Sequence, residues 1–260
     1  MGGILITIAR RSFGLLVFMA GWEIVSATGL VSPDYMPRVA TIGAALFDFL
    51  GSGKFWLSFG ITLHRMLVGL AVAVVLALGL AVVAARFPLL RRALEPTTDI
   101  LRSLPPPALV PLLIFVLGIG PGLFYSIVIF GCMWATYVSA SNALATAEPV
   151  QLQTARSLGL TPWQIMWQVR LPAAAPEIFT GIRLSAAISL LATVATEMLV
   201  GGEGLGSLIY NAGFSLLWDQ MYALMVVIGA LGVALNIGVA LVRRPLAGWQ
   251  TRLSAMGAQA

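Results

Sequence analysis

The run from Met66 to Ala85 constrains this chain more than any other feature. It holds about twenty consecutive residues without a charged side chain, and Arg86 follows it directly. An α-helix of this length crosses the roughly 30 Å hydrocarbon core of a bilayer. The composition agrees, because 59% of the residues are hydrophobic and only 10% are charged, against about 25% in average globular domains. The sequence therefore predicts an all-α integral membrane protein.

Five further apolar segments bring the expected number of spans to six. The third is broken, because Pro105-Pro106-Pro107 interrupts the backbone hydrogen-bond ladder. A retained first span is favoured over a signal peptide, because Glu23 interrupts its apolar run. A short helix from Thr41 to Leu50 and a glycine-rich outer connection from Gly201 to Asp219 join the spans. The other expected spans cover residues 13–31, 93–117, 123–144, 176–200 and 221–242.

Charge predicts the orientation of these spans. With the N-terminus inside, most arginines become cytoplasmic, as the positive-inside rule requires. Both termini are therefore expected in the cytoplasm. The same placement explains the net charge of +5 without a nucleic-acid partner. We expect a cytoplasmic N-terminus at 1–12, one transmembrane domain at 13–244 containing a coupling loop at 149–172, and a cytoplasmic tail at 245–260, with no second domain.

The segment from Pro149 to Pro172 is the longest water-compatible stretch between apolar blocks. Its pattern predicts two short helices joined by a sharp turn. Gly159 stands where a helix end needs positive φ. Thr161 and Gln164 form a capping box around Pro162. Leu171-Pro172 is expected to stop the second helix, and Pro176-Glu177 to open the fifth span. Such a pair is suited to lie on the bilayer surface and dock into a partner.

This segment resembles the EAA signature of permease subunits of ATP-binding-cassette importers. The first two positions depart from the pattern, with Gln153 in place of Glu and Thr154 in place of Ala, while the glycine and Leu-Pro are intact. The resemblance implies that the loop fits a groove on a cytoplasmic ATPase. The residues that it assigns to coupling are Gln153, Thr154, Ala155, Gly159, Val169, Leu171 and Pro172.

The chain is similar beyond this loop to the taurine, sulfonate and nitrate permease branch. The similar positions include Trp22-Glu23, Met36-Pro37, Leu63-His64-Arg65, Leu101-Arg102-Ser103-Leu104-Pro105, Gly181-Ile182-Arg183, Glu197-Met198 and Gly204-Leu205-Gly206. The resemblance implies a type I importer permease in the bacterial inner membrane. A second copy, two ATPase subunits and an extracytoplasmic binding protein would complete the importer. The substrate would be a small anion such as a sulfonate, taurine or nitrate, or else a vitamin precursor or aromatic carboxylate.

No enzymatic site is expected in the chain itself. Gly201-Gly202-Glu203-Gly204-Leu205-Gly206 lacks the Gly-Lys-Ser/Thr ending of a nucleotide-binding loop and follows a membrane helix. ATP and Mg²⁺ would therefore belong to the partner ATPases, and no cofactor to this chain. One cysteine and one histidine leave no expected disulfide or metal cluster.

Five residues are candidates for the translocation pathway or a gate: Arg102, Met133, Trp134, Tyr137 and Glu197. Each has a structural alternative. Arg102 could bind an anion or pair with Asp99 or Glu95, and Arg183 carries the same ambiguity. The three residues of the fourth span could line a pathway or pack between helices. Glu197 could gate the pathway or bind the backbone of the glycine-rich loop. His64-Arg65 is interpreted as an interfacial anchor.

Two other classes of function stay open. A secondary transporter would need its own coupling residues, and the isolated acids Glu23 and Glu197 are the candidates for that role. A membrane scaffold would bind a partner through residues 149–172 without moving a substrate.

Overall fold

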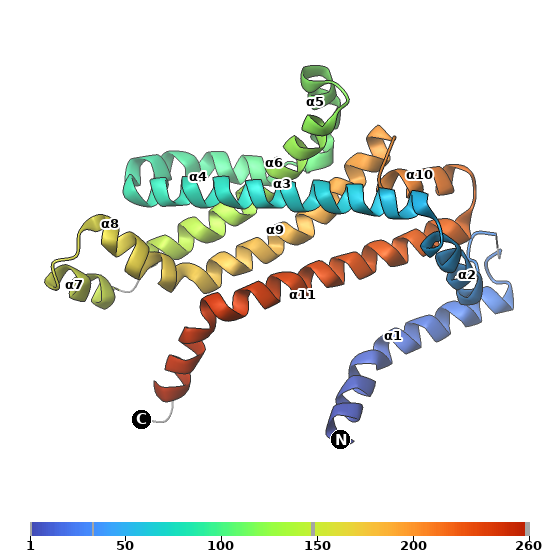
Figure 1. Cartoon of the computed structure of the whole chain (residues 1–260), viewed down its shortest axis with the longest axis horizontal. Coiled ribbons are helices and arrows are strands. Elements are labelled where there is room, and N and C mark those ends of the chain that lie inside the picture. The colour runs from blue at the N-terminus through green and yellow to red at the C-terminus, as the bar shows by residue number, and fades with distance from the viewer. Residues whose placement is uncertain (1, 33, 147–148, 258–260) are drawn as a thin grey trace.

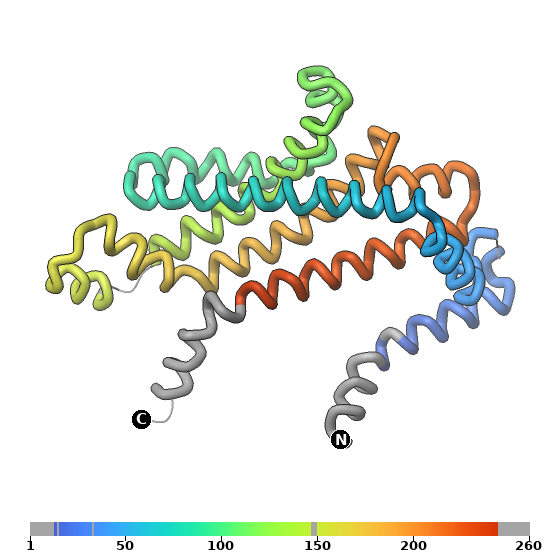
Figure 2. Tube along the Cα trace, viewed as in Figure 1, coloured from blue at the N-terminus to red at the C-terminus, as the bar shows by residue number. Residues whose placement is uncertain are grey.

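The computed structural model of the chain describes residues 2–32, 34–146 and 149–257, and every regular element in these ranges is helical (Figures 1 and 2). In chain order the elements are α1 (Gly2–Thr28), α2 (Val39–Leu50), α3 (Gly53–Arg86), α4 (Pro88–Ser103), the 3₁₀ helix η1 (Pro106–Leu109), α5 (Val110–Leu117), α6 (Pro121–Ala145), α7 (Pro149–Ser157), α8 (Pro162–Ile165), the π-helix η2 (Met166–Arg170), α9 (Leu171–Val200), α10 (Leu205–Phe214) and α11 (Trp218–Gly257).

Helices α3, α6 and α9 form the centre of the bundle. Ala73, Ala77 and Ala81 recur every fourth residue on α3 and are fully buried. Small side chains at this spacing let two membrane helices approach closely, and α3 packs against α6 along this seam. Between α6 and α9, Thr136 and Ser185 hydrogen-bond through their hydroxyls at 2.7 Å. The core therefore combines small-residue packing with a buried polar link.

Within the described residues, four helices are long and apolar enough to cross a membrane, and a fifth span is counted if the bent pair α4 and η1–α5 is taken as one. The two parts of that pair meet at 89°. The predicted break at Pro105-Pro106-Pro107 is thus confirmed. The first predicted span falls on α1, whose described apolar part, Leu16–Thr28, is shorter than a full span. Figure 1 shows α1 approaching α2 at its C-terminal end, where Trp22 also packs against Tyr222 of α11.

Several predicted boundaries are wrong. Leu171-Pro172 does not stop a helix, because α8, η2 and α9 form one continuous helix from Pro162 to Val200. The π-turn ends at Arg170, two residues before Pro172. It loosens the backbone hydrogen-bond ladder where the proline ring would otherwise crowd the preceding turn. Pro176 consequently lies inside α9 instead of opening it.

Two further boundaries also differ. The connection predicted from Gly201 to Asp219 contains the ten-residue helix α10. The last helix, expected to end at Arg243-Arg244-Pro245, is helical to Gly257.

The bundle has two distinct ends. Helices α7 and α8 lie at one end, and α2 and α10 lie at the other (Figure 1). Helix α3 finishes at Arg86 at the α7–α8 end, and Arg156 and Arg170 belong to the segment at that end. The arginines thus gather where the positive-inside rule places the cytoplasm, and the orientation itself stays a prediction. We call the α7–α8 end inner and the α2–α10 end outer.

Candidate functional site

The predicted coupling segment, residues 149–172, is built around the turn at Gly159. The Leu160 N–H donates to the Ala155 carbonyl at 3.1 Å, and the Gly159 N–H donates to the Arg156 carbonyl at 3.0 Å. This pair of bonds is the Schellman ending of a helix, which places its glycine at positive φ. Gly159 has φ of 74°. The predicted helix end is confirmed.

The second helix of the segment begins with the expected capping box. The Gln164 N–H donates to Thr161 Oγ1 at 3.3 Å, and the Thr161 N–H donates to Gln164 Oε1 at 2.8 Å. The end of α7 and the start of α8 are therefore both capped by hydrogen bonds from within the segment, and this capping needs no partner protein. The turn between α7 and α8 is consequently a defined structure and not a loose linker.

The predicted coupling residues occupy different depths. Gln153, Thr154 and Gly159 are exposed, whereas Val169, Leu171 and Pro172 are half-buried. Ala155 is only 4% exposed and therefore packs within the segment. Large apolar side chains nevertheless point outward, because Leu158 is 74% and Trp163 65% exposed.

The outer end holds a buried polar junction around Glu197, which is fully buried on α9. Its carboxylate accepts from Arg65 Nη1 at 2.9 Å and from the Gly206 N–H at 3.0 Å. Thr62 Oγ1 lies 2.9 Å from Oε2 and in turn accepts the Leu205 N–H at 2.8 Å. One carboxylate thus joins α9, α3 and the start of α10.

This geometry fits the structural alternative for Glu197, which binds the backbone of the glycine-rich connection. It also corrects the interpretation of Arg65 as an interfacial anchor. The Arg65 side chain is 13% exposed and pairs with Glu197, and its guanidinium lies 3.7 Å above the centre of the Phe124 ring. Sequence reasoning missed Thr62 and Arg65 as partners. The available signal in the sequence was one acid, Glu197, and one arginine, Arg65, in the outer parts of two different spans.

The candidates on α6 lie mostly in the core. Tyr137 is 3% exposed and packs among the alanines of α3, and Met133 fills a gap between two buried clusters. Trp134 is half-buried against Phe130, and its indole N–H has no hydrogen-bond partner among the described residues. These contacts agree with the packing alternative and leave Trp134 as the most available of the three.

Arg102 is paired with its neighbour on α4. Its Nε donates to Asp99 Oδ1 at 3.1 Å, and both side chains are more than half exposed. This is the ion pair that the sequence offered as the alternative to an anion site. The structure does not bring Arg102 together with the α6 candidates or with Glu197 through any hydrogen bond of the described residues.

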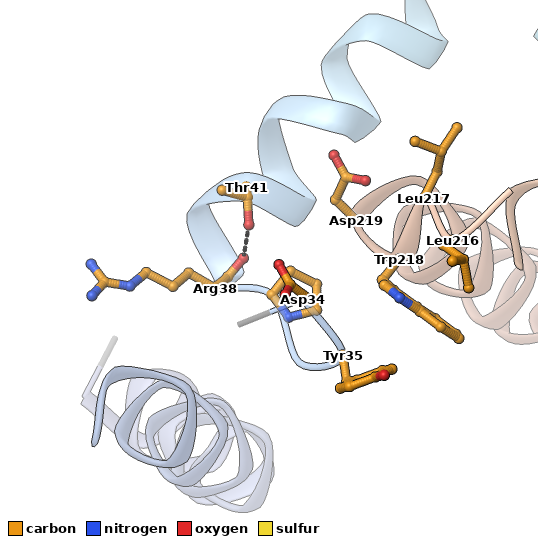
Figure 3. A pocket seen from close by; sticks show the side chains of 9 residues that line it. Asp34, Tyr35, Arg38, Thr41, Leu216, Leu217, Trp218 and Asp219 are labelled. Atoms are coloured by element: carbon orange, nitrogen blue, oxygen red, sulfur yellow. Dashed lines mark hydrogen bonds between the residues drawn. The ribbon is translucent and has the colours of Figure 1, made fainter. Parts of the chain in front are cut away.

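A pocket of about 610 Å³ opens at the outer end, between the α1–α2 connection and the start of α11. Figure 3 shows Asp219 and Trp218 on one side, and Arg38 with its side chain directed away from them. Three hydrogen bonds fix the nearby α1–α2 connection and the first residue of α2 to α1. Trp22 Nε1 donates to the Pro37 carbonyl, Ser26 Oγ donates to the Met36 carbonyl, and Glu23 accepts the Val39 N–H.

The described residues hold no cluster of His, Cys, Asp and Glu that could bind a metal ion. The one cysteine, Cys132, is buried in α6 and donates to the Ser185 carbonyl. The chemistry of the chain therefore rests on its helix geometry and on a few charged side chains.

Comparison with known proteins agrees with this architecture. The chain is 28% identical over 240 residues to the taurine transport system permease protein TauC of Escherichia coli, covering 90% of this chain and 87% of the relative. It is 27% identical to the nitrate import permease protein NrtB of Synechocystis, covering 88% and 86%. It is 26% identical to the bicarbonate transport system permease protein CmpB of Synechocystis, covering 90% and 87%.

Solved structures share the fold. A chain of a bacterial alginate transporter in complex with its periplasmic protein superposes with a TM-score of 0.60 at 13% identity, covering 93% of this chain and 97% of that one. A chain of the MetNI methionine transporter gives 0.58 at 20% identity, covering 74% and 94%. The family described as binding-protein-dependent transport system inner membrane component matches residues 73–247. Since this match spans well over half of the sequence, the chain belongs to that family of ATP-binding-cassette importer permeases.

Proposed function

We propose that two copies of this chain form the translocation pathway of an importer for a small anion of the sulfonate, nitrate or bicarbonate type. As a family member the chain is a permease subunit of the inner membrane, and ATP is hydrolysed by a separate subunit. Relatives for taurine, nitrate and bicarbonate support the anion class. A vitamin precursor or aromatic carboxylate is the alternative cargo.

The observation that carries this proposal is the exposed apolar tip of a rigid coupling segment. Leu158, Trp163 and Trp167 are 74%, 65% and 52% exposed at the inner end. A water-facing cluster of this kind marks a protein interface. Trp163 and Trp167 also pack edge to face, with ring centres 5.5 Å apart, so the surface is preformed. We assign this tip to the groove of the cytoplasmic ATPase, of which two copies bind.

The proposed cycle follows from the continuity of the segment with α9. ATP binding closes the ATPase pair and moves the two coupling segments. The second half of each segment, from Pro162 onward, belongs to the same 39-residue helix as the fifth span, so its displacement changes the tilt of that span. An extracytoplasmic binding protein delivers the anion at the outer end, near α2 and α10.

The two alternative classes have less support. Glu23 and Glu197, the acids that a secondary transporter would use for ion coupling, both accept hydrogen bonds from backbone N–H groups. They are therefore engaged in structure. A scaffold would share the exposed tip and would differ only in moving no substrate.

The test is ATP hydrolysis and uptake in proteoliposomes that contain this chain, its ATPase and its binding protein. We expect hydrolysis to be stimulated by the loaded binding protein for one of ethanesulfonate, taurine, nitrate or bicarbonate. A stable complex without stimulation or uptake would favour the scaffold. Uptake by the permease without ATPase would favour a secondary transporter.

Gly159→Asp tests the coupling segment within the same assay. Apart from its chain neighbours, no atom lies within 4 Å of a Cβ added at Gly159, and aspartate tolerates positive φ better than most residues. We therefore expect the variant to insert normally and to lose stimulated hydrolysis through its effect on the ATPase contact. Gly159→Asn is the matched control for the charge. Normal uptake by Gly159→Asp would contradict the assignment.

A further inference from the structure

Arg183 is a charged side chain inside a membrane span. It lies seven residues beyond Pro176, where the predicted fifth span begins, about 10 Å along the helix axis at about 1.5 Å per residue. The hydrocarbon core is about 30 Å thick, so the guanidinium stands well within it. Charged groups at this depth face a water-filled cavity or a partner charge, because lipid does not solvate them.

No carboxylate compensates this charge among the described residues. The Arg183 Nε donates to Asn236 Oδ1 of α11 at 2.6 Å, and an amide supplies no negative charge. Arg65 and Arg102 differ in this respect, since each has an acid within 3.1 Å. The spans packed beside Arg183 offer no nearby substitute, because α6 contains no acid and the described part of α11 has only Asp219 in its first turn.

A cavity of about 740 Å³ opens beside the guanidinium, between α6, α9 and α11. Gly229 and Gly232 lie in its α11 wall, and a Cβ added at Gly229 would meet no atom within 4 Å. Two hydroxyls also line it. The Thr180 hydroxyl donates to the Pro176 carbonyl, whereas Ser139 Oγ has no hydrogen bond among the described residues and remains a donor. The site thus combines a fixed cation, a free hydroxyl and apolar walls.

We propose that this cavity is an anion site on the translocation pathway, in which Arg183 holds a small oxyanion as it crosses. Asn236 fixes the Nε edge, and the two terminal nitrogens remain to bind a sulfonate, nitrate or bicarbonate through parallel hydrogen bonds. The volume leaves room for water around an ion of this size. This inference rests on the proposed function and adds the place where the permease itself recognises its substrate.

The first test compares Arg183→Gln with wild type in the reconstituted importer, using whichever of ethanesulfonate, nitrate or bicarbonate the wild type takes up. The liposomes contain phosphatidylcholine only. We expect the maximal uptake rate to fall by about tenfold or more, because a charge-assisted bidentate contact is lost. Arg183→Lys keeps the positive charge but lacks the planar guanidinium, so its maximal uptake rate should lie between those of wild type and Arg183→Gln. Arg86→Gln, at the inner end of α3, is the control and should match wild type.

A second variant leaves Arg183 in place. Ala187 lines the same cavity one helical turn further along α9, so Ala187→Asp puts a carboxylate beside the guanidinium. This internal anion should compete with substrate and block uptake while the complex assembles normally. Ala187→Asn is the uncharged control and should retain uptake. Equal uptake by Ala187→Asp and Ala187→Asn would overturn the proposal even if Arg183→Gln failed to fold.

The remaining outcomes separate this inference from the proposed function. Wild-type uptake that Arg183→Gln leaves unchanged would overturn the anion site and leave the importer assignment intact. Absence of uptake by the wild type with every anion would overturn both. A last experiment repeats the uptake assay in liposomes in which phosphatidylglycerol makes up a fifth of the lipid. If the wild type requires this lipid and Arg183→Gln does not, the cavity binds a lipid phosphate and the substrate site is refuted.

Discussion

The buried pair of Arg65 and Glu197 should be strongly coupled in the free energy of unfolding. Glu197 is fully buried and Arg65 is 13% exposed, with 2.9 Å between Nη1 and Oε1. In Arg65→Met the carboxylate keeps only Thr62 and the Gly206 N–H as donors. Removing one partner of a buried pair costs about 3–5 kcal/mol, because the other charge stays buried without compensation.

The double variant Arg65→Met/Glu197→Gln removes that stranded charge. It should therefore lose much less than the sum of the two single variants, with a coupling energy of about 2 kcal/mol or more. The cycle also cancels the other losses at Arg65, namely its bond to the Glu203 carbonyl and its contact with Phe124. The free energies come from equilibrium unfolding in mixed detergent and SDS micelles, followed by circular dichroism.

The pair Arg102 and Asp99 is the matched control. It has a similar separation of 3.1 Å, but its side chains are 56% and 67% exposed. Solvent screening should hold its coupling energy below about 0.5 kcal/mol. If the Arg65–Glu197 cycle is additive to within about 0.5 kcal/mol, the outer junction does not depend on this ion pair and our account of Glu197 is refuted.

Two glycine pairs give further predictions, both measured by the same unfolding assay. A methyl group at Gly204 would overlap the Glu197 carboxylate, whereas Gly202 has free space around it. Gly204→Ala should therefore destabilise the protein by about 2 kcal/mol more than Gly202→Ala. Equal losses would contradict the geometry of the junction around Glu197. On α3, an added Cβ at Gly69 would lie 2.6 Å from Val128 Cγ1, but at Gly79 it would meet nothing. Gly69→Ala should therefore lower the free energy of unfolding by about 1–3 kcal/mol. Gly79→Ala should be neutral or stabilising by up to about 1 kcal/mol. A neutral Gly69→Ala would mean that α3 and α6 are less closely packed.

Local signals predicted much of the fold. The apolar runs located the spans, and the Gly159 turn and the Thr161–Gln164 capping box depend on neighbouring residues alone. The break at Pro105 follows in the same way from the missing N–H groups. The 89° angle at this break is not given by any local pattern, because missing N–H groups predict where the helix breaks but not how its two parts are oriented.

The errors arose where proline was interpreted as a stop. Proline ends a helix only if the backbone hydrogen bonds around it cannot rearrange. Here the π-turn from Met166 to Arg170 provides that rearrangement. Helix α10 was missed because glycines at its start hide its periodicity, and its N-terminus is fixed instead by Thr62 and Glu197 from other helices. Such long-range partners leave no mark in a single sequence.

The position of these irregularities has a consequence for the proposed cycle. Backbone bonding along the Pro162–Val200 helix is weakest between Met166 and Pro176, where a π-turn and two prolines without N–H groups follow one another. Beyond Glu177 the helix is regular to Val200 and is fixed to α3 and α10 through Glu197. Any bending caused by the ATPase therefore concentrates near the inner end, while the outer two-thirds of α9 moves together with α10. Arg183 lies on the outer side of this flexible region, so a tilt of the fifth span carries the guanidinium with it and changes the side of the membrane to which the bound anion is exposed.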